Sequence, residues 1–265
     1  ASYHVECARH GQLLFNQGMT MKKILSIISV TCLLAAIASP ALANPPTDDQ
    51  IARMEQASPA RATVKPAKQR KILIINQCEG FRHSSVECGS KAFEIMGRKT
   101  GAFSTLAVDD FSILEKPEFD TFDAIIMNNT TVRLPLLSDG DEEREARAQK
   151  RFLDFVRGGK GIIGVHAATD CLYKWPEYGD MIGGYFNAHP WHENVRVKLD
   201  DPGHPILAAF SGQDFDVIDE IYQFRDPYSR EKLRVLLSLD VKKTNMDKKA
   251  IKRDDNDFAV AWIRE

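Results

Sequence analysis

The chain has 265 residues, with 35 lysines and arginines against 37 aspartates and glutamates, so its formal net charge at pH 7 is −2. Without a basic excess, nucleic acid is not an expected partner, because proteins that bind it gather lysine and arginine to neutralise phosphates. Cys78, Cys88 and Cys171, the three cysteines after residue 43, are an odd number, which excludes a fully paired disulfide scaffold and leaves a Cys78–Cys88 pair open.

The first 43 residues carry targeting signals rather than a fold pattern. Residues 1–20 precede Met21 and have no pattern, so they are interpreted as a non-native leader. Residues 21–43 combine two lysines, an apolar run at Ile24–Ala38 and an Ala41-Leu42-Ala43 end, which is typical of a cleaved secretory signal peptide. We therefore expect a periplasmic or secreted protein without membrane contact after cleavage. The apolar run is short for an uncleaved anchor.

Residues 44–69 are predicted to be a linker, because four prolines lie among polar residues and alanines. At most one helical turn is expected there, around residues 50–56. The domain proper is predicted at residues 70–265. It is expected to be incomplete at its C-terminal end, because the chain stops just after a strand-like run.

The first half of the domain alternates short apolar runs with helical patterns. Four buried strands are predicted, at Lys71–Asn76, Phe103–Val108, Phe122–Met127 and from Gly161. Helices are predicted at Ser85–Lys99 and Asp139–Arg157, the second capped by Ser138 or Asp139, with a short turn or helix at Asp109–Leu114. Strands alternating with helices indicate βαβ units, so we predict an α/β fold built on a parallel sheet.

The second half is less regular. A loop-rich insert is expected at residues 175–186, where prolines, glycines and aromatic residues cluster. Later strands are predicted at Val195–Leu199, Asp219–Phe224, Leu233–Leu239 and Phe258–Ile263.

The fourth strand ends in the first candidate site. The segment Gly161–Val165 is followed by small and polar residues that begin with His166 and include Asp170. Ligands of open α/β sheets bind at the carboxyl ends of the strands, so both side chains are candidates for chemistry. The position corresponds to a nucleophile elbow, but a histidine there can act as a general base or a ligand rather than an acyl acceptor. The alternative is a structural histidine bonded to loop backbone.

Two further clusters contribute candidates. Residues 183–192, expected to form a loop, bring aromatic side chains and polar groups together, which suits a sugar ring; His189 and Trp191 are the predicted contacts. The alternative is a small hydrophobic core inside the loop. On the strand at 219–224, Glu220 and Tyr222 share a face and can bind hydroxyls or transfer protons, unless they are a surface pair.

His83 follows the first strand and therefore also lies at a strand carboxyl end. Histidines and carboxylates of this kind bind zinc or iron, but no H-E-x-x-H or H-x-H spacing occurs. Whether the site holds a metal or another cofactor is left open. There is also no phosphate loop and no G-x-G-x-x-G motif.

Several ordered segments carry a family resemblance. They are KILIIN, FRHSS, GVHAATD, GGYFNAHPWH, HPI and DEIYQF, spread over residues 70–265, and together they resemble the ThuA-like domain, named for trehalose utilisation. The resemblance implies the class I glutamine amidotransferase-like fold, a flavodoxin-like parallel sheet with helices on both faces. Members usually continue past the point where this chain stops. In the amidotransferases a cysteine occupies the turn where this chain has His166, which implies that thiol-dependent glutamine hydrolysis is absent.

The predicted function is action on a carbohydrate, with a 3-keto-glycoside of disaccharide catabolism as the substrate class that the resemblance implies. The predicted catalytic residues are His166, Asp170 and Glu220, with Asp170 orienting His166. The predicted substrate-binding residues are His83, His189, Trp191 and Tyr222. The alternative is a sugar-binding module without catalysis that uses the same pocket. A third reading, a hydrolase using Cys78 or Cys171, is disfavoured because neither cysteine stands at the elbow.

Overall fold

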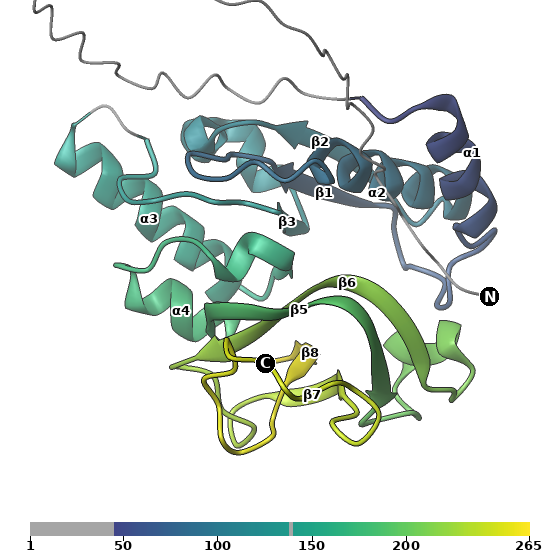
Figure 1. Ribbon diagram of the computed structural model, residues 1–265. Coiled ribbons are helices and arrows are strands. Elements are labelled where there is room, and N and C mark those ends of the chain that lie inside the picture. Colours follow the sequence, from purple (N-terminus) through teal and green to yellow (C-terminus); the bar gives the residue numbers. More distant parts are fainter. Residues whose placement is uncertain (1–44, 138–139) are drawn as a thin grey trace, which may run out of the picture.

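The computed structural model describes residues 45–137 and 140–265 (Figure 1). The predicted leader and signal peptide, and the predicted helix caps Ser138 and Asp139, lie outside the described residues. Among the helices of the described ranges, none is both long enough and apolar enough to cross a membrane.

The N-terminal layer is a parallel sheet, as predicted. Its strands are β1 (Arg70–Ile75), β2 (Phe103–Val108), β3 (Ala124–Asn128) and β4 (Gly161–Val165), in the order β2-β1-β3-β4. Consecutive apolar residues such as Leu73, Ile74 and Ile75 are all buried, because helices cover the sheet on both faces.

The two covering helices are α2 (Val86–Thr100) and α3 (Glu142–Arg157). Successive residues of a strand point to opposite faces, and β3 shows which helix lies on each. Met127 belongs to the core cluster that holds Phe152 of α3, whereas the next side chain, Asn128, donates a hydrogen bond to the Val86 carbonyl of α2 at 2.8 Å. The expected turn near residue 110 is the 3₁₀-helix η1 (Phe111–Glu115), followed by η2 (Pro117–Thr121).

The segment expected to be a linker contains more structure than the single turn that was predicted. The helix α1 (Asp48–Ala57) begins after Thr47, which forms a capping box with Gln50. Met54 of α1 packs against Cys88 and Ile95 of α2, so the helix is held by an apolar contact with the domain. The pattern was missed because only one side chain of this short helix is buried.

After β4 the chain leaves the parallel sheet. The order β2-β1-β3-β4 matches the first four strands of the flavodoxin-like order. Within the described ranges, however, no fifth parallel strand pairs with β4, so the finer flavodoxin-like expectation is not confirmed. The 3₁₀-helix η3 (His166–Thr169) and the helix α4 (Pro176–Ile182) follow instead.

The C-terminal layer is an antiparallel sheet that was not predicted. Its strands are β5 (Tyr185–Leu199), β6 (Phe215–Arg225), β7 (Arg234–Leu239) and β8 (Ala259–Ile263), in the order β6-β5-β7-β8, with the 3₁₀-helix η4 (Pro205–Phe210) between β5 and β6. The loop predicted at 183–192 is wrong, because β5 already begins at Tyr185. Two register shifts between Phe186 and Trp191 interrupt the alternation that would have marked a strand.

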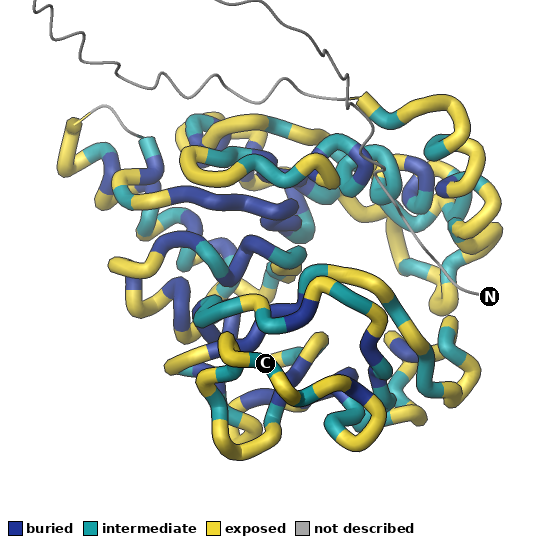
Figure 2. The backbone as a smooth tube through the Cα atoms, in the orientation of Figure 1, coloured by how far each residue is buried: buried dark blue, intermediate teal, exposed yellow. Residues whose placement is uncertain are grey.

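The two layers lie against each other, and long strands β5 and β6 arch below the parallel sheet in Figure 1. Buried segments run through both layers, whereas the loops are largely exposed (Figure 2). A hydrogen bond of 3.0 Å from the Trp262 indole of β8 to the Ile182 carbonyl of α4 joins the C-terminal sheet to the preceding helix. The carboxyl ends of β1 and β4 thereby face β6.

Candidate functional site

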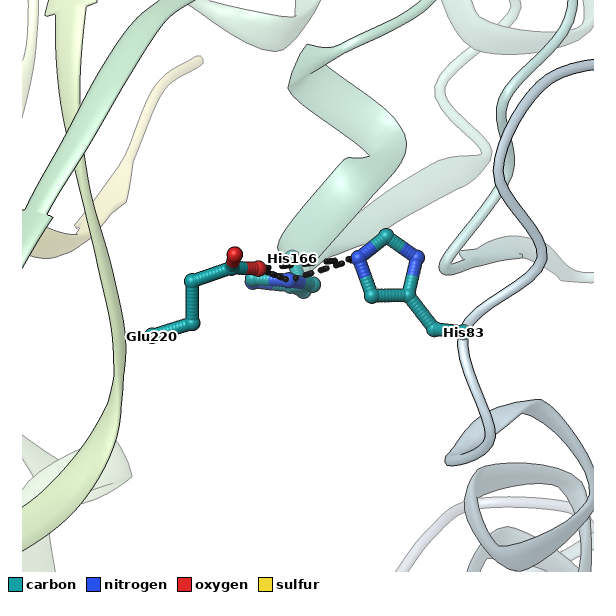
Figure 3. Close-up of side chains that lie close together, drawn as sticks. All are labelled: His83, His166 and Glu220. Atoms are coloured by element: carbon teal, nitrogen blue, oxygen red, sulfur yellow. Dashed lines mark hydrogen bonds and ion pairs between the residues drawn. The ribbon is translucent and has the colours of Figure 1, made fainter. Parts of the chain in front are cut away.

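Three side chains from distant parts of the chain meet between the two layers (Figure 3). His83 lies in the loop after β1, His166 directly follows β4, and Glu220 extends from β6. The His166 Nε2 atom is 3.2 Å from Nε2 of His83 and 3.0 Å from Oε2 of Glu220. The His83 Nε2 atom is 3.6 Å from the same carboxylate oxygen. Three of the predicted site residues therefore form one cluster.

The backbone at His166 explains how its ring reaches this point. Its φ of 48° lies in the left-handed region, which residues with a β-carbon rarely adopt, and the chain turns there from β4 into η3. Such a turn presents the side chain beyond the end of the sheet. Backbone strain of this kind is characteristic of functional sites.

Burial dominates the electrostatics of the two imidazoles. It lowers the pKa of His83 and the pKa of His166, because the charged form loses its hydration. The Glu220 carboxylate opposes this effect for both rings without overcoming it. Both histidines are therefore neutral at pH 7. The Nδ1 atom of His83 is buried and has no hydrogen-bond partner among the described residues.

Aromatic rings surround the cluster on one side. The Tyr222 ring lies 4.2 Å from the His166 ring, and the Phe186 ring lies 4.4 Å from Tyr222. His189 stacks on Phe186 at 5.8 Å, and its Nδ1 atom is 3.4 Å from Oε1 of Glu220. Glu220 and Tyr222 share a face of β6, as predicted. The structure thus brings His189 and Tyr222 to the same site.

Asp170 is near the cluster but does not contact His166 in the described structure. Its carboxylate instead accepts a hydrogen bond from the Tyr173 hydroxyl. Its charge acts at longer range and raises the pKa of His166 by a smaller amount than Glu220 does. The carboxylate that contacts His166 in the structure is therefore that of Glu220, whereas the sequence pointed to Asp170.

Trp191 is not brought to the site. Its side chain is fully buried in the core of the C-terminal sheet, where it packs against Phe258 and donates a hydrogen bond to the Asn245 carbonyl at 2.8 Å. The predicted substrate contact does not fit this position, because Trp191 pairs with Ile221 and its side chain therefore lies on the sheet face opposite to Glu220.

The sequence reasoning missed Phe81 and the pair of Tyr173 and Arg225. The Phe81 side chain is 72% exposed, and its ring meets the His83 ring edge-on at 4.8 Å. The Arg225 guanidinium lies over the Tyr173 ring at 4.9 Å. Phe81 stands two residues before His83, so the proximity of an aromatic residue to a candidate histidine was the available signal.

The cysteines do not take part. Cys78 carries a free thiol, so the open Cys78–Cys88 pairing does not occur. Burial raises the pKa of Cys171 to about 12, which removes it as a nucleophile. The Cys78 thiol donates to the backbone carbonyls of Asn76 and Asn129.

Comparison with known proteins bears on the family and the fold. The family model described as ThuA, trehalose utilisation, matches residues 71–265. A crystal structure of a protein assigned as ThuA-like from Bacteroides uniformis ATCC 8492 is 23% identical, with a TM-score of 0.53, and the match covers 78% of this chain and 81% of that one. At this identity the likeness concerns the fold. No curated protein matches.

Fold and site together define a mixed α/β protein whose histidine-rich site lies at the carboxyl ends of its parallel strands. The chain belongs to the ThuA family of trehalose utilisation.

Proposed function

We propose that this chain is an exported enzyme that acts on a carbohydrate, with 3-keto-glycosides of disaccharide catabolism as its substrate class. The observation that carries the proposal is the 3.0 Å contact between His166 Nε2 and the Glu220 carboxylate, beside the Tyr222 and Phe186 rings. Membership of a trehalose-utilisation family supports a sugar as substrate. The signal-like pattern of residues 21–43 supports export.

The His166–Glu220 pair suits proton transfer near neutral pH. A neutral imidazole bonded to a carboxylate can accept a proton and share the resulting charge with its partner. In a 3-keto-glycoside, the carbon next to the ketone carries an acidic proton. The pair takes this proton, a carbon–carbon double bond forms, the bond to the glycosidic oxygen breaks, and the departing oxygen receives a proton from the protonated pair.

The aromatic wall supplies a surface for the sugar ring. Sugars present apolar C–H faces and polar hydroxyl edges, so rings next to polar groups match them. Tyr222 and Phe186 provide the apolar face, and His189, whose side chain is 51% exposed, can reach a hydroxyl. Thiol-dependent amidotransferase chemistry is not part of the proposal, because the turn after β4 presents His166 and the nearby Cys171 is buried.

The test is turnover of 3-keto-disaccharides by the purified protein and by His166→Ala and Glu220→Gln. Losing one proton-transfer group is expected to lower kcat by on the order of 10²–10⁴-fold. His204→Asn is the matched control, because His204 caps η4 through its Nδ1 atom, outside the cluster. Unchanged turnover in His166→Ala contradicts the proposal. Binding of keto-sugars without any product, measured by calorimetry, would instead identify a non-catalytic sugar-binding module.

A further inference from the structure

The contacts among His83, His166 and Glu220 pose a hydrogen-bonding problem. The Nε2 atom of His166 lies within 3.2 Å of one partner and 3.0 Å of the other, yet a ring nitrogen offers either one proton or one lone pair. If His166 donates to Glu220, its Nε2 has nothing left for His83. The Nδ1 atom of His83 has no hydrogen-bond partner among the described residues either. Within that part of the chain, the His83 ring therefore makes no other hydrogen bond that would decide which partner Nε2 of His166 takes.

The same three atoms form a triangle of suitable size for a coordinated ion. Its edges are 3.0, 3.2 and 3.6 Å. A point equidistant from the corners of such a triangle lies about 1.9 Å from each, so an ion roughly 1 Å out of the plane sits about 2.1 Å from all three, the usual bond length from zinc to imidazole nitrogen or carboxylate oxygen. One cation therefore satisfies all three atoms without moving them far.

We propose that His83 Nε2, His166 Nε2 and a Glu220 carboxylate oxygen bind one divalent transition-metal cation between the two sheets. Two imidazoles and one carboxylate are the donor set of catalytic zinc sites and of non-haem iron sites, which keep positions open for water or substrate. This donor set is the one group of three or more histidine, cysteine or acidic side chains within the described residues that lies close enough to share an ion.

The surroundings fit a cation. Negative charge is concentrated around the cluster, since Asp170 and Asp219 act on His166 in addition to Glu220. A 2+ ion offsets this charge.

Neighbouring side chains hold the donors in place. His189 Nδ1 lies 3.4 Å from the second oxygen of Glu220, which leaves Oε2 directed to the two other donors. Tyr222 packs against the His166 ring at 4.2 Å and fixes its plane. Partners of this kind orient metal ligands and are worth about 10–100-fold in metal affinity.

The metal site stands independently of the sugar chemistry, but the role of the ion there rests on the proposed function. The aromatic wall of Tyr222 and Phe186 lies beside the three donors. A bound cation would supply Lewis-acid chemistry to a ketone or hydroxyl oxygen of a sugar lying on that wall. With His166 Nε2 and Glu220 Oε2 engaged as ligands, proton transfer would fall to the second Glu220 oxygen and to His189, whose Nδ1 atom lies 3.4 Å from it.

The experiment is calorimetric titration of chelator-treated, reduced protein with ZnCl₂, followed by Co²⁺ titration with visible absorption. We expect one equivalent of Zn²⁺ and a Co²⁺ spectrum of a nitrogen–oxygen site. His83→Ala and the isosteric Glu220→Gln are each expected to weaken zinc binding by on the order of 100-fold or more. Losing a residue that contacts the ion lowers the metal affinity more than losing a residue that only orients such a ligand. His204→Asn is expected to bind as the unmodified protein does.

The proposal is overturned if the protein takes up no cation, or if folded Glu220→Gln binds zinc with unchanged affinity. Turnover separates it from the proposed function. Zinc binding without action on keto-sugars leaves the metal site intact and removes the function. Turnover that survives full metal removal leaves the function intact and removes the role of the ion in it.

Discussion

Phe81 is the most exposed aromatic side chain beside the site, at 72%, and its ring contacts His83. An exposed aromatic ring next to a polar cluster can stack against the apolar face of a sugar. Phe81→Ala is expected to raise KM for a keto-disaccharide roughly fivefold, for a loss of about 1 kcal/mol, with little change in kcat. Ile206→Ala, an exposed apolar side chain on η4, is the control. A fall in kcat alone would contradict a binding role.

The cysteines give a second prediction at the scale of single residues. Burial raises the pKa of the Cys171 thiol to about 12, so only on the order of one molecule in 10⁴ carries the thiolate at pH 8. Cys88 is buried as well, whereas Cys78 is partly exposed. In native protein truncated after the predicted signal peptide, a thiol reagent at pH 8 is expected to modify Cys78 first, and Cys171 only after unfolding. Rapid labelling of Cys171, located by peptide mass analysis, would show that its burial is wrong.

The individual site residues were predictable to different degrees. His166 follows its strand directly and His83 lies in the loop after β1, and the rule that parallel strands end at one edge was enough to bring them together. Glu220 was found by its alternation with Tyr222. Trp191 was misplaced because its segment was expected to be a loop, whereas in β5 it pairs with Ile221 and so lies on the sheet face opposite to Glu220.

At the scale of elements, one carboxylate ties a loop to a helix. Glu145 of α3 is buried and accepts hydrogen bonds from the backbone N–H groups of Leu136 and Leu137 at 2.8 and 3.1 Å. A glutamine at this position has only one acceptor oxygen. Its NH₂ group would point at the second backbone N–H, which would then lose its hydrogen-bond acceptor. Glu145→Gln is therefore expected to lower the free energy of unfolding by about 1–3 kcal/mol, measured by urea denaturation.

Glu143 provides the matched control on the same helix. Its side chain is 92% exposed, so Glu143→Gln is expected to change stability by less than about 0.5 kcal/mol. If both substitutions lowered the free energy of unfolding equally, the hydrogen bonds of Glu145 would contribute no more to stability than the charge of an exposed glutamate does.

Element predictions succeeded where local pattern decides the structure. The parallel strands and the helices α2 and α3 appear within a few residues of their expected positions, because runs of buried β-branched residues and amphipathic spacing are strong signals. The antiparallel sheet was not predicted, although each of its four strands was located at least in part. Its pairing depends on contacts between distant segments, such as Tyr185 with Arg225, which no local pattern encodes.

At the scale of the whole molecule, the proposed metal site connects the two layers. His83 and His166 belong to the parallel-sheet layer and Glu220 to the antiparallel sheet, so an ion bound by all three stabilises the native state but not the unfolded one. At a free concentration 100 times Kd the gain is about 2.7 kcal/mol, which corresponds to a rise in Tm of roughly 5–11 °C for a domain of this size. Differential scanning calorimetry with and without Zn²⁺ measures it.

Two comparisons make the calorimetric prediction specific. His83→Ala is expected to lose the zinc-dependent rise in Tm, and His204→Asn is expected to keep it. A zinc-dependent rise that persists in His83→Ala would place the stabilising ion elsewhere in the molecule.

The division of the site between the two layers also has a consequence for biosynthesis. Glu220 is synthesised 54 residues after His166, and it reaches the two imidazoles only once β6 has paired with β5. At ordinary translation speeds it leaves the ribosome roughly 3–10 s later. During that interval the growing polypeptide carries both histidines but not the carboxylate, so the cluster is assembled only after the C-terminal sheet has been synthesised.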